Sequence, residues 1–160
     1  MTTIRPATKA DLDPLAQLWL DGWTEAHAAH VPPELTAQRP LDSFRRRLDG
    51  YGDRLRTAGP LGAPLGLCTI SNDELDQIFV SDAARGTGLA AALLADGEAR
   101  LAAGGVSHAH LLCVIENTRA ARFYEKHGWE NTGPSLESVF TDDGPFEFTV
   151  LRFEKTLNAS

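Results

Sequence analysis

A glycine-rich loop between a predicted strand and a predicted helix constrains the fold of this chain most. The strand covers residues 74–80, and the loop that follows contains Gly86 and Gly88. Apolar residues at positions 90, 93, 94, 97 and 101 predict an amphipathic helix directly after the loop. Such a loop leaves backbone N–H groups free to bind an anion, and the helix dipole adds partial positive charge there. We therefore expect a phosphorylated ligand near the two glycines.

The rest of the chain alternates strand and helix signals. Strands are predicted at residues 2–6, 54–57, 65–71, 74–80, 110–115, 136–140 and 146–155. Helices are predicted from Thr8 or Asp11 onward, at 41–48, after the glycine loop and at 118–126. Asn72-Asp73 suits a tight hairpin turn, so the middle of the chain is expected to be antiparallel. Together these signals predict one α/β (α+β) domain over residues 1–160, with a mixed, mostly antiparallel central sheet of about seven strands and helices on both faces.

Composition limits the possible partners and the compartment. The formal net charge of -7 argues against nucleic acid as the main partner, because phosphate backbones are bound by clustered Lys and Arg. An acidic surface favours a cationic substrate such as an amine. No apolar run is long enough to cross a bilayer and no secretory signal opens the chain, so we expect a cytoplasmic protein without membrane partners. Cys68 and Cys113 lie in apolar strand-like runs and are expected to be buried and free.

Two motifs resemble those of a known family. Residues 85–90 match the loop pattern Gln/Arg-x-x-Gly-x-Gly/Ala. The pattern N-x-x-A-x-x-F-Y-x-K-x-G-W is matched by Asn117, Ala120, Phe123, Tyr124, Lys126, Gly128 and Trp129. Through both motifs the chain resembles the GNAT superfamily, the acyl-CoA-dependent N-acyltransferases, over essentially its whole length.

The resemblance implies that acetyl-CoA is the cosubstrate and that main-chain N–H groups of the loop bind its pyrophosphate. The loop residues expected to do so are Arg85, Gly86, Thr87, Gly88, Leu89 and Ala90. A register two residues earlier puts Ala83 at the Gln/Arg position, so the expectation attaches to the loop as a whole. The backbone of Phe79 and Val80 is expected to hold the acetyl carbonyl and the pantetheine arm.

Tyr124 carries the expected chemistry of the second motif. In the family, the tyrosine at this position meets the CoA sulfur as the thiolate leaves. Full proton transfer from a tyrosine of pKa about 10 to a thiolate of pKa about 8.5 is uphill by roughly 2 kcal/mol, which favours a hydrogen bond to the developing thiolate. Taken alone, Tyr124 also fits a core aromatic residue. Asn117 is expected either to cap the following helix or to bond the pantetheine arm, and the sequence leaves both roles open.

The acceptor amine must lose a proton before it attacks. Neutralising an alkylamine of pKa about 10.4 costs roughly 4.6 kcal/mol at pH 7, so a base would help. Glu74 and Asp76 share one face of the strand before the loop by period-two parity, and a strand carboxylate there serves as base in some family members. Glu74 is our predicted base, although both carboxylates also fit solvated charges at a hairpin edge. His27 and His30 are expected in a loop where the family has its substrate-recognition segment.

Other readings of the same residues remain. Residues 86–91 also fit the dinucleotide fingerprint Gly-x-Gly-x-x-Gly/Ala, but the preceding hairpin and the lack of an acidic residue near position 106 disfavour it. His108, His110 and His127 lack the spacing and company of a metal site, so no metal is predicted. We expect an N-acetyltransferase that moves an acetyl group from acetyl-CoA to a primary amine of a small molecule or peptide by direct attack. The resemblance also implies a homodimer, since members of the family often pair. The alternative is an acyl-CoA-binding sensing or regulatory module without efficient transfer.

Overall fold

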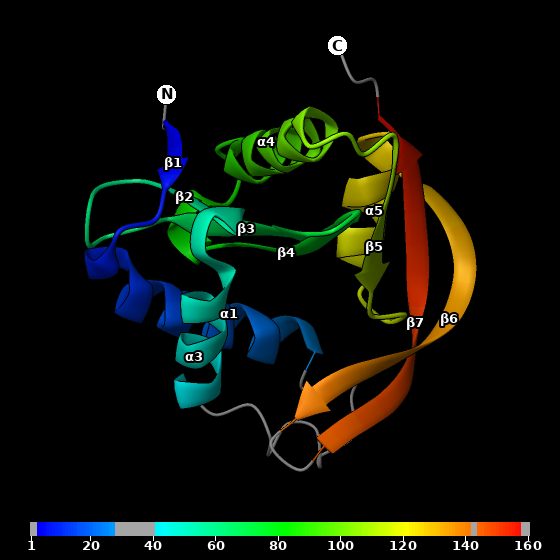
Figure 1. Ribbon diagram of the computed structural model, residues 1–160, viewed down its shortest axis with the longest axis horizontal. Helices are drawn as coiled ribbons and strands as arrows, with labels where there is room; N and C mark the ends of the chain where they lie inside the picture. The colour runs from blue at the N-terminus through cyan, green and yellow to red at the C-terminus, as the bar shows by residue number, and fades with distance from the viewer. Residues whose placement is uncertain (1–2, 28–40, 142–143, 158–160) are drawn as a thin grey trace.

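The computed structural model describes residues 3–27, 41–141 and 144–157, and a seven-stranded sheet organises these segments. Its strands are β1 (Ile4–Pro6), β2 (Leu55–Ala58), β3 (Gly66–Ser71), β4 (Glu74–Val80), β5 (His108–Cys113), β6 (Glu130–Thr141) and β7 (Gly144–Thr156). They lie in the order β1-β2-β3-β4-β5-β7-β6, and every neighbouring pair except β4–β5 is antiparallel (Figure 1). The predicted mixed, mostly antiparallel sheet of about seven strands is confirmed.

Helices cover both faces of this sheet, as expected. On one face lie α1 (Leu12–His27) and α3 (Leu41–Tyr51), whose apolar side chains, led by Trp19 and Phe44, pack against Leu67 of β3. On the other face, α4 (Leu89–Ala103) and α5 (Thr118–Lys126) pack against a second apolar cluster centred on Phe153 of β7. The sheet therefore separates two cores. No helix in the described part of the chain is long and apolar enough to cross a membrane.

A buried carboxylate fixes the start of α1. Asp11 ends a short 3-10 turn (Lys9–Asp11) and is fully buried. Its carboxylate accepts hydrogen bonds from both terminal nitrogens of Arg5, at 2.8 and 3.0 Å, and from the backbone N–H of Gly62 at 3.0 Å. The backbone N–H and hydroxyl of Thr8 donate to the same carboxylate at 2.7 and 2.8 Å. One ionised group thus joins β1, the entrance of the helix and the loop after β2.

A β-bulge in β4 decides which way its side chains point. Thr69 of β3 pairs with Gln77, but the next residue, Ile70, pairs with Leu75, so Asp76 is an extra residue in β4. The bulge interrupts the alternation of the strand. The Asp76 carboxylate accepts a hydrogen bond from the Tyr51 hydroxyl, at the end of α3. Three residues later, Phe79 packs into the same helical layer, whereas Ile78 and Val80 pack under α4.

The parallel strands β4 and β5 share fewer paired residues than any other neighbouring strands of the sheet. Its register contains a single pair, Glu74 with His110, and the backbone N–H of His110 also donates to the carbonyl of Asp73 at 3.0 Å. Beyond this point the two strands are not paired. The opening lies at the ends of β4 and β5 that lead into the glycine loop and α5.

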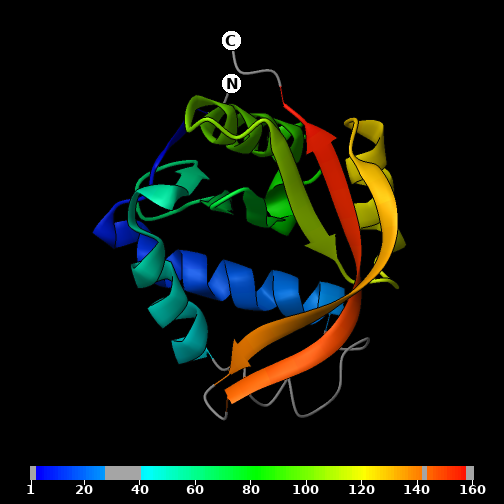
Figure 2. The same ribbon diagram turned by 45° about the vertical axis from the view of Figure 1, so that its right-hand side comes forward.

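Two expectations about segment boundaries need correction. His27 was expected in a loop, but it is the last residue of α1, and His30 lies outside the described residues. The last two strands are longer than expected and form a curved ribbon whose far end lies beside α1 (Figure 2). Phe146 and Phe148 on that ribbon pack against the α1–α3 cluster, which helps to explain why the ladder continues there. Cys68 and Cys113 are buried and free, as expected.

Candidate active site

A cavity of about 500 Å³ lies where β4 and β5 separate. Four parts of the chain line it: the end of α1, the end of β4, the glycine loop with the start of α4, and α5 with the segment that leads into it. The lining residues are Gly22, Glu25, Ile78, Phe79, Val80, Arg85, Ala90, Glu116, Asn117, Thr118, Arg119, Ala120, Phe123 and Tyr124. The cavity thus brings together residues from both predicted motifs.

The glycine loop has a backbone conformation that other residues adopt only with strain. Gly86 and Gly88 have φ angles of +77° and +84°, in the left-handed region, and Gly88 is the N-cap of α4. Apart from the adjoining residues of the chain, no heavy atom lies within 4 Å of a Cβ placed at either glycine, so backbone conformation is what demands glycine here. The first turn of α4 therefore begins at the cavity with N–H groups that have no partner within the helix.

Tyr124 lines the cavity from α5 but is almost fully buried. Its ring packs against Phe123 and Phe153. Among the described residues, its hydroxyl has no hydrogen-bond partner. Burial, with smaller contributions from Cys113 and Cys68, raises the pKa of Tyr124 above its ordinary value. The hydroxyl therefore stays protonated at neutral pH and can donate a hydrogen bond into the cavity.

Asn117 begins α5 and lines the cavity. Its side-chain oxygen accepts a hydrogen bond from the backbone N–H of Ala120 at 3.2 Å. This is the capping role expected from the sequence. The second expected role, a bond to the pantetheine arm, stays a prediction.

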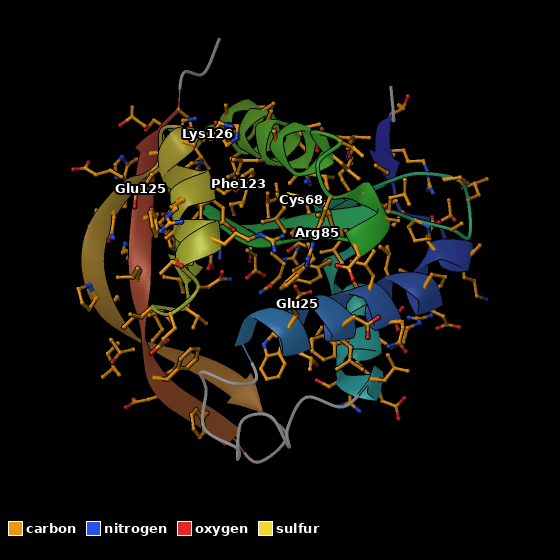
Figure 3. All side chains as sticks on the ribbon, turned by 180° about the vertical axis from the view of Figure 1, so that it is seen from behind. Glu25, Cys68, Arg85, Phe123, Glu125 and Lys126 are labelled. Carbon is orange, nitrogen blue, oxygen red and sulfur yellow. The ribbon has the colours of Figure 1, made fainter. Side chains whose placement is uncertain are left out.

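Glu25 faces Arg85 across the cavity, from the last turn of α1 (Figure 3). Their side chains form an ion pair of 2.7 Å between Glu25 Oε2 and Arg85 Nη2. Gly22 lies one helical turn earlier, and a Cβ placed there would come within 2.5 Å of the Phe79 ring. The absence of a side chain at Gly22 therefore lets α1 approach β4 closely and brings Glu25 to the cavity.

Glu74 is outside the cavity wall, at the opposite end of β4 from Val80. Six residue steps along the strand put roughly 20 Å between their Cα atoms. Glu74 is half-buried, and its Oε1 lies 4.0 Å from His110 Nε2. Burial, followed by repulsion from Asp76 and Glu137, raises the pKa of Glu74 to about 7. Burial and then Arg152 lower the pKa of His110.

A family model for the acetyltransferase (GNAT) domain matches residues 34–147. The chain belongs to the GNAT acetyltransferase family. The resemblance seen in the two motifs is thereby confirmed, and GNAT membership makes the protein an acyltransferase. A search of curated proteins gives no match.

Solved structures share the GNAT fold with this chain. A GCN5-related N-acetyltransferase from Rhodopseudomonas palustris is 19% identical, with a TM-score of 0.74 over 98% of this chain and 96% of that one. The PaiA N-acetyltransferase from Thermoplasma acidophilum, solved with coenzyme A, is 18% identical, with a TM-score of 0.67 over 98% and 99%. YncA from Salmonella typhimurium, solved with acetyl-CoA, is 18% identical, with a TM-score of 0.65 over 99% and 95%.

Most of the GNAT site residues expected from the sequence surround this one cavity. Phe79, Val80, Arg85, Ala90, Asn117 and Tyr124 line it, and Gly86, Thr87, Gly88 and Leu89 belong to the adjoining loop. Glu74 is the exception. Sequence reasoning missed Gly22, Glu25 and Arg119, which also line the cavity. The one local signal among these is Gly22, a glycine inside an otherwise helical pattern.

Proposed function

We propose that this protein is an N-acetyltransferase that moves an acetyl group from acetyl-CoA to a primary amine of a small molecule or peptide. The observation that carries the proposal is the cavity itself. The glycine loop and the start of α4 lie on one wall, in a form suited to an anion, and the protonated Tyr124 hydroxyl, without a partner among the described residues, lies on another. Acetyl-CoA needs both, because it presents a pyrophosphate at one point and releases a thiolate at another. The coenzyme A and acetyl-CoA complexes of GNAT neighbours support it as cosubstrate.

The proposed reaction is direct attack. The amine nitrogen forms a bond to the thioester carbonyl carbon, the carbon–sulfur bond breaks, and the electron pair leaves on sulfur. Tyr124 donates a hydrogen bond to that developing thiolate. The backbone at Phe79 and Val80 orients the acetyl group. The proton lost by the amine is taken up by a base.

Glu74 remains our proposed base, and we propose that water molecules carry the proton from the amine to its carboxylate. A pKa of about 7 leaves its carboxylate partly ionised at neutral pH, which suits a proton acceptor. Its place at the far end of β4 rules out direct contact with an amine beside Phe79. Asp76 lies two residues nearer on the same face as Phe79 and provides a polar step on that path.

Glu74→Gln should make the protein more stable in alkali and less active. Since the folded pKa is raised above the ordinary value, the folded state holds a proton that the unfolded state has lost between about pH 4.5 and 7. Stability therefore falls as pH rises through this window. We expect the variant to gain about 1–3 kcal/mol in unfolding free energy at pH 8 and nothing at pH 4, and to lose about tenfold in kcat/KM at pH 7. Denaturant unfolding and pH–rate profiles measure both.

The exposed Glu125 provides the control for this prediction. Glu125→Gln should change neither the unfolding free energy at pH 8 nor the rate. If Glu74→Gln gains stability but keeps the pH–rate profile of the wild type, the raised pKa of Glu74 is real but Glu74 is not the base.

Gly88→Ala should weaken coenzyme binding. Alanine at a φ of +84° is strained by about 1–2 kcal/mol, so the loop must change conformation or bear that strain. We expect the Kd of CoA, measured by calorimetry, to rise about tenfold. Gly50→Ala is the matched control, because Gly50 lies in α3 at an ordinary φ with open space around it. Unchanged CoA binding by Gly88→Ala would mean that the loop backbone does not hold the coenzyme.

Thermal unfolding with acetyl-CoA, CoA, NAD and NADP in parallel tests the proposed function first. A ligand at 100 times its Kd adds about 2.7 kcal/mol of stability. Stabilisation by the CoA species should be followed by release of free thiol in a screen of primary amines. Binding without thiol release on any amine would favour the sensing module, and stabilisation by NAD would favour the dinucleotide site.

The location, oligomeric state and partners expected from the sequence are part of this proposal. A cytoplasmic location, a homodimer and the absence of nucleic-acid or membrane partners stay predictions. The net charge of -7 supports a cationic acceptor over an anionic one.

A further inference from the structure

The ion pair between Glu25 and Arg85 joins α1 to the glycine loop across the cavity. Arg85 Nη2 lies 2.7 Å from Glu25 Oε2 and 3.1 Å from Asp82 Oδ1. The Arg85 side chain is 35% exposed, so the pair is open to an incoming ligand. Glu25 also faces Arg119 at the start of α5, and the hydrogen bond from Arg85 is the largest cause that lowers the pKa of Glu25.

Both contacts of Arg85 are made by Nη2, and this limits how Arg85 can bind a phosphate. A guanidinium binds a phosphate most strongly through two parallel N–H bonds. It offers two such pairs, Nε with Nη2 and Nη1 with Nη2, and both include Nη2. In the structure, both carboxylate contacts of Arg85 use Nη2. Nη2 has two hydrogens, and one of them donates to Glu25. A phosphate must therefore either displace Glu25 from that hydrogen or bind through the other one, beside a carboxylate that repels it.

The two carboxylates do not compete equally. Asp82 is 83% exposed and lies three residues before Arg85 on the same loop, so its contact is local and solvated. Glu25 comes from another element, and Gly22 fixes its position by letting α1 pack on Phe79. The pair with Glu25 therefore holds the Arg85 side chain to α1.

We propose that Glu25 is a positioning residue that holds Arg85 against α1 and competes with the coenzyme pyrophosphate for it. Coenzyme binding then exchanges one ion pair for another: Arg85 leaves Glu25 and takes the pyrophosphate. This inference rests on the proposed function, because it requires a CoA ester in the cavity. It goes beyond that function by giving Glu25 control over coenzyme affinity.

Calorimetric titration of Glu25→Gln with CoA tests the exchange. Since a solvated ion pair contributes up to about 1 kcal/mol, the variant should bind CoA about two- to fivefold more tightly than the wild type. The gain should persist with 3′-dephospho-CoA, which keeps the pyrophosphate. It should disappear in the Arg85→Gln background, where the cation that pairs with Glu25 at 2.7 Å is absent. The KM for acetyl-CoA should fall by a similar factor.

Glu116→Gln is the matched control, because Glu116 lines the same cavity and has no ion pair with Arg85. Equal tightening by both variants would mean general charge repulsion and would overturn the exchange. Weaker CoA binding by Glu25→Gln would show that Glu25 orients Arg85 for the phosphate, which also overturns it. Loss of the gain with 3′-dephospho-CoA would make the 3′-phosphate the partner of Arg85 and refute the pyrophosphate assignment. Equal CoA affinities of the wild type and Glu25→Gln would overturn the exchange alone. If the wild type binds no CoA, the proposed function itself fails.

Discussion

Tyr124→Phe is expected to lower kcat by about one to three orders of magnitude while the Kd of CoA stays within a few-fold. In the proposed mechanism, the hydroxyl acts on the leaving sulfur, whose charge develops only in the transition state. Its ring, which packs against Phe123 and Phe153, remains in the variant. Thiol release with a saturating amine measures kcat, and calorimetry measures the Kd.

Stability separates this loss from damage to the fold. Since the Tyr124 hydroxyl has no partner among the described residues, Tyr124→Phe should leave the unfolding free energy nearly unchanged. The other tyrosine of the chain provides the contrast. Tyr51→Phe removes a hydrogen bond to the Asp76 carboxylate and should cost about 1–3 kcal/mol. If Tyr124→Phe instead loses CoA affinity and stability together with kcat, Tyr124 is a packing residue.

Asp11→Ala should be among the most destabilising substitutions in the chain, with a loss of about 3–5 kcal/mol in unfolding free energy at pH 7. The change removes a fully buried carboxylate and leaves the donors of Arg5, Thr8 and Gly62 without their acceptor. Asp13→Ala, two residues later, is the control. Asp13 also pairs with an arginine, Arg45, but its side chain is 89% exposed, so its loss should cost less than about 1 kcal/mol. Urea unfolding of both variants measures the difference.

Acid should remove the same stabilisation from the wild type. The hydrogen bonds from Arg5 are the main reason that the pKa of Asp11 is well below its ordinary value of 3.8. A carboxyl group with a depressed folded pKa stabilises the protein fully above its unfolded pKa and loses that contribution as pH falls through the folded one. The difference between wild type and Asp11→Ala should therefore be constant above about pH 5 and shrink below pH 4. Equal stabilities at pH 7 would mean that the buried pair contributes nothing net.

Local chemistry made several elements predictable from the sequence. The expected bounds of α5 match the structure because Asn117 caps its start and Gly128, at a φ of +89°, follows its end. The β3–β4 hairpin follows from Asn72, which adopts a φ of +55° at the turn. The cavity residues of both motifs were likewise predicted, since each motif keeps its residues close in sequence.

Features that depend on distant contacts were not predictable in this way. β6 was expected only from residue 136, because Gly133 and Pro134 are typical of turns, yet both pair with β7 across a local irregularity in register. Parity along β4 gave no sign of the bulge at Asp76, which depends on its partner strand. Glu25 and Arg85 are sixty residues apart, and only the packing of α1 on β4 brings them into contact.

The single residue pair between β4 and β5 has a mechanical consequence. Strands β1 to β4 and strands β5 to β7 form two blocks, and this one pair is the backbone link of the sheet between them. Such a joint permits the blocks to move against each other, and a ligand inserted in the opening restrains that motion. We expect backbone amides at the end of β4 to exchange hydrogen quickly with solvent in the free protein and slowly with acetyl-CoA bound. On this expectation, the bound coenzyme braces the two blocks against each other, and the sheet is stiffest while the cavity between them is filled.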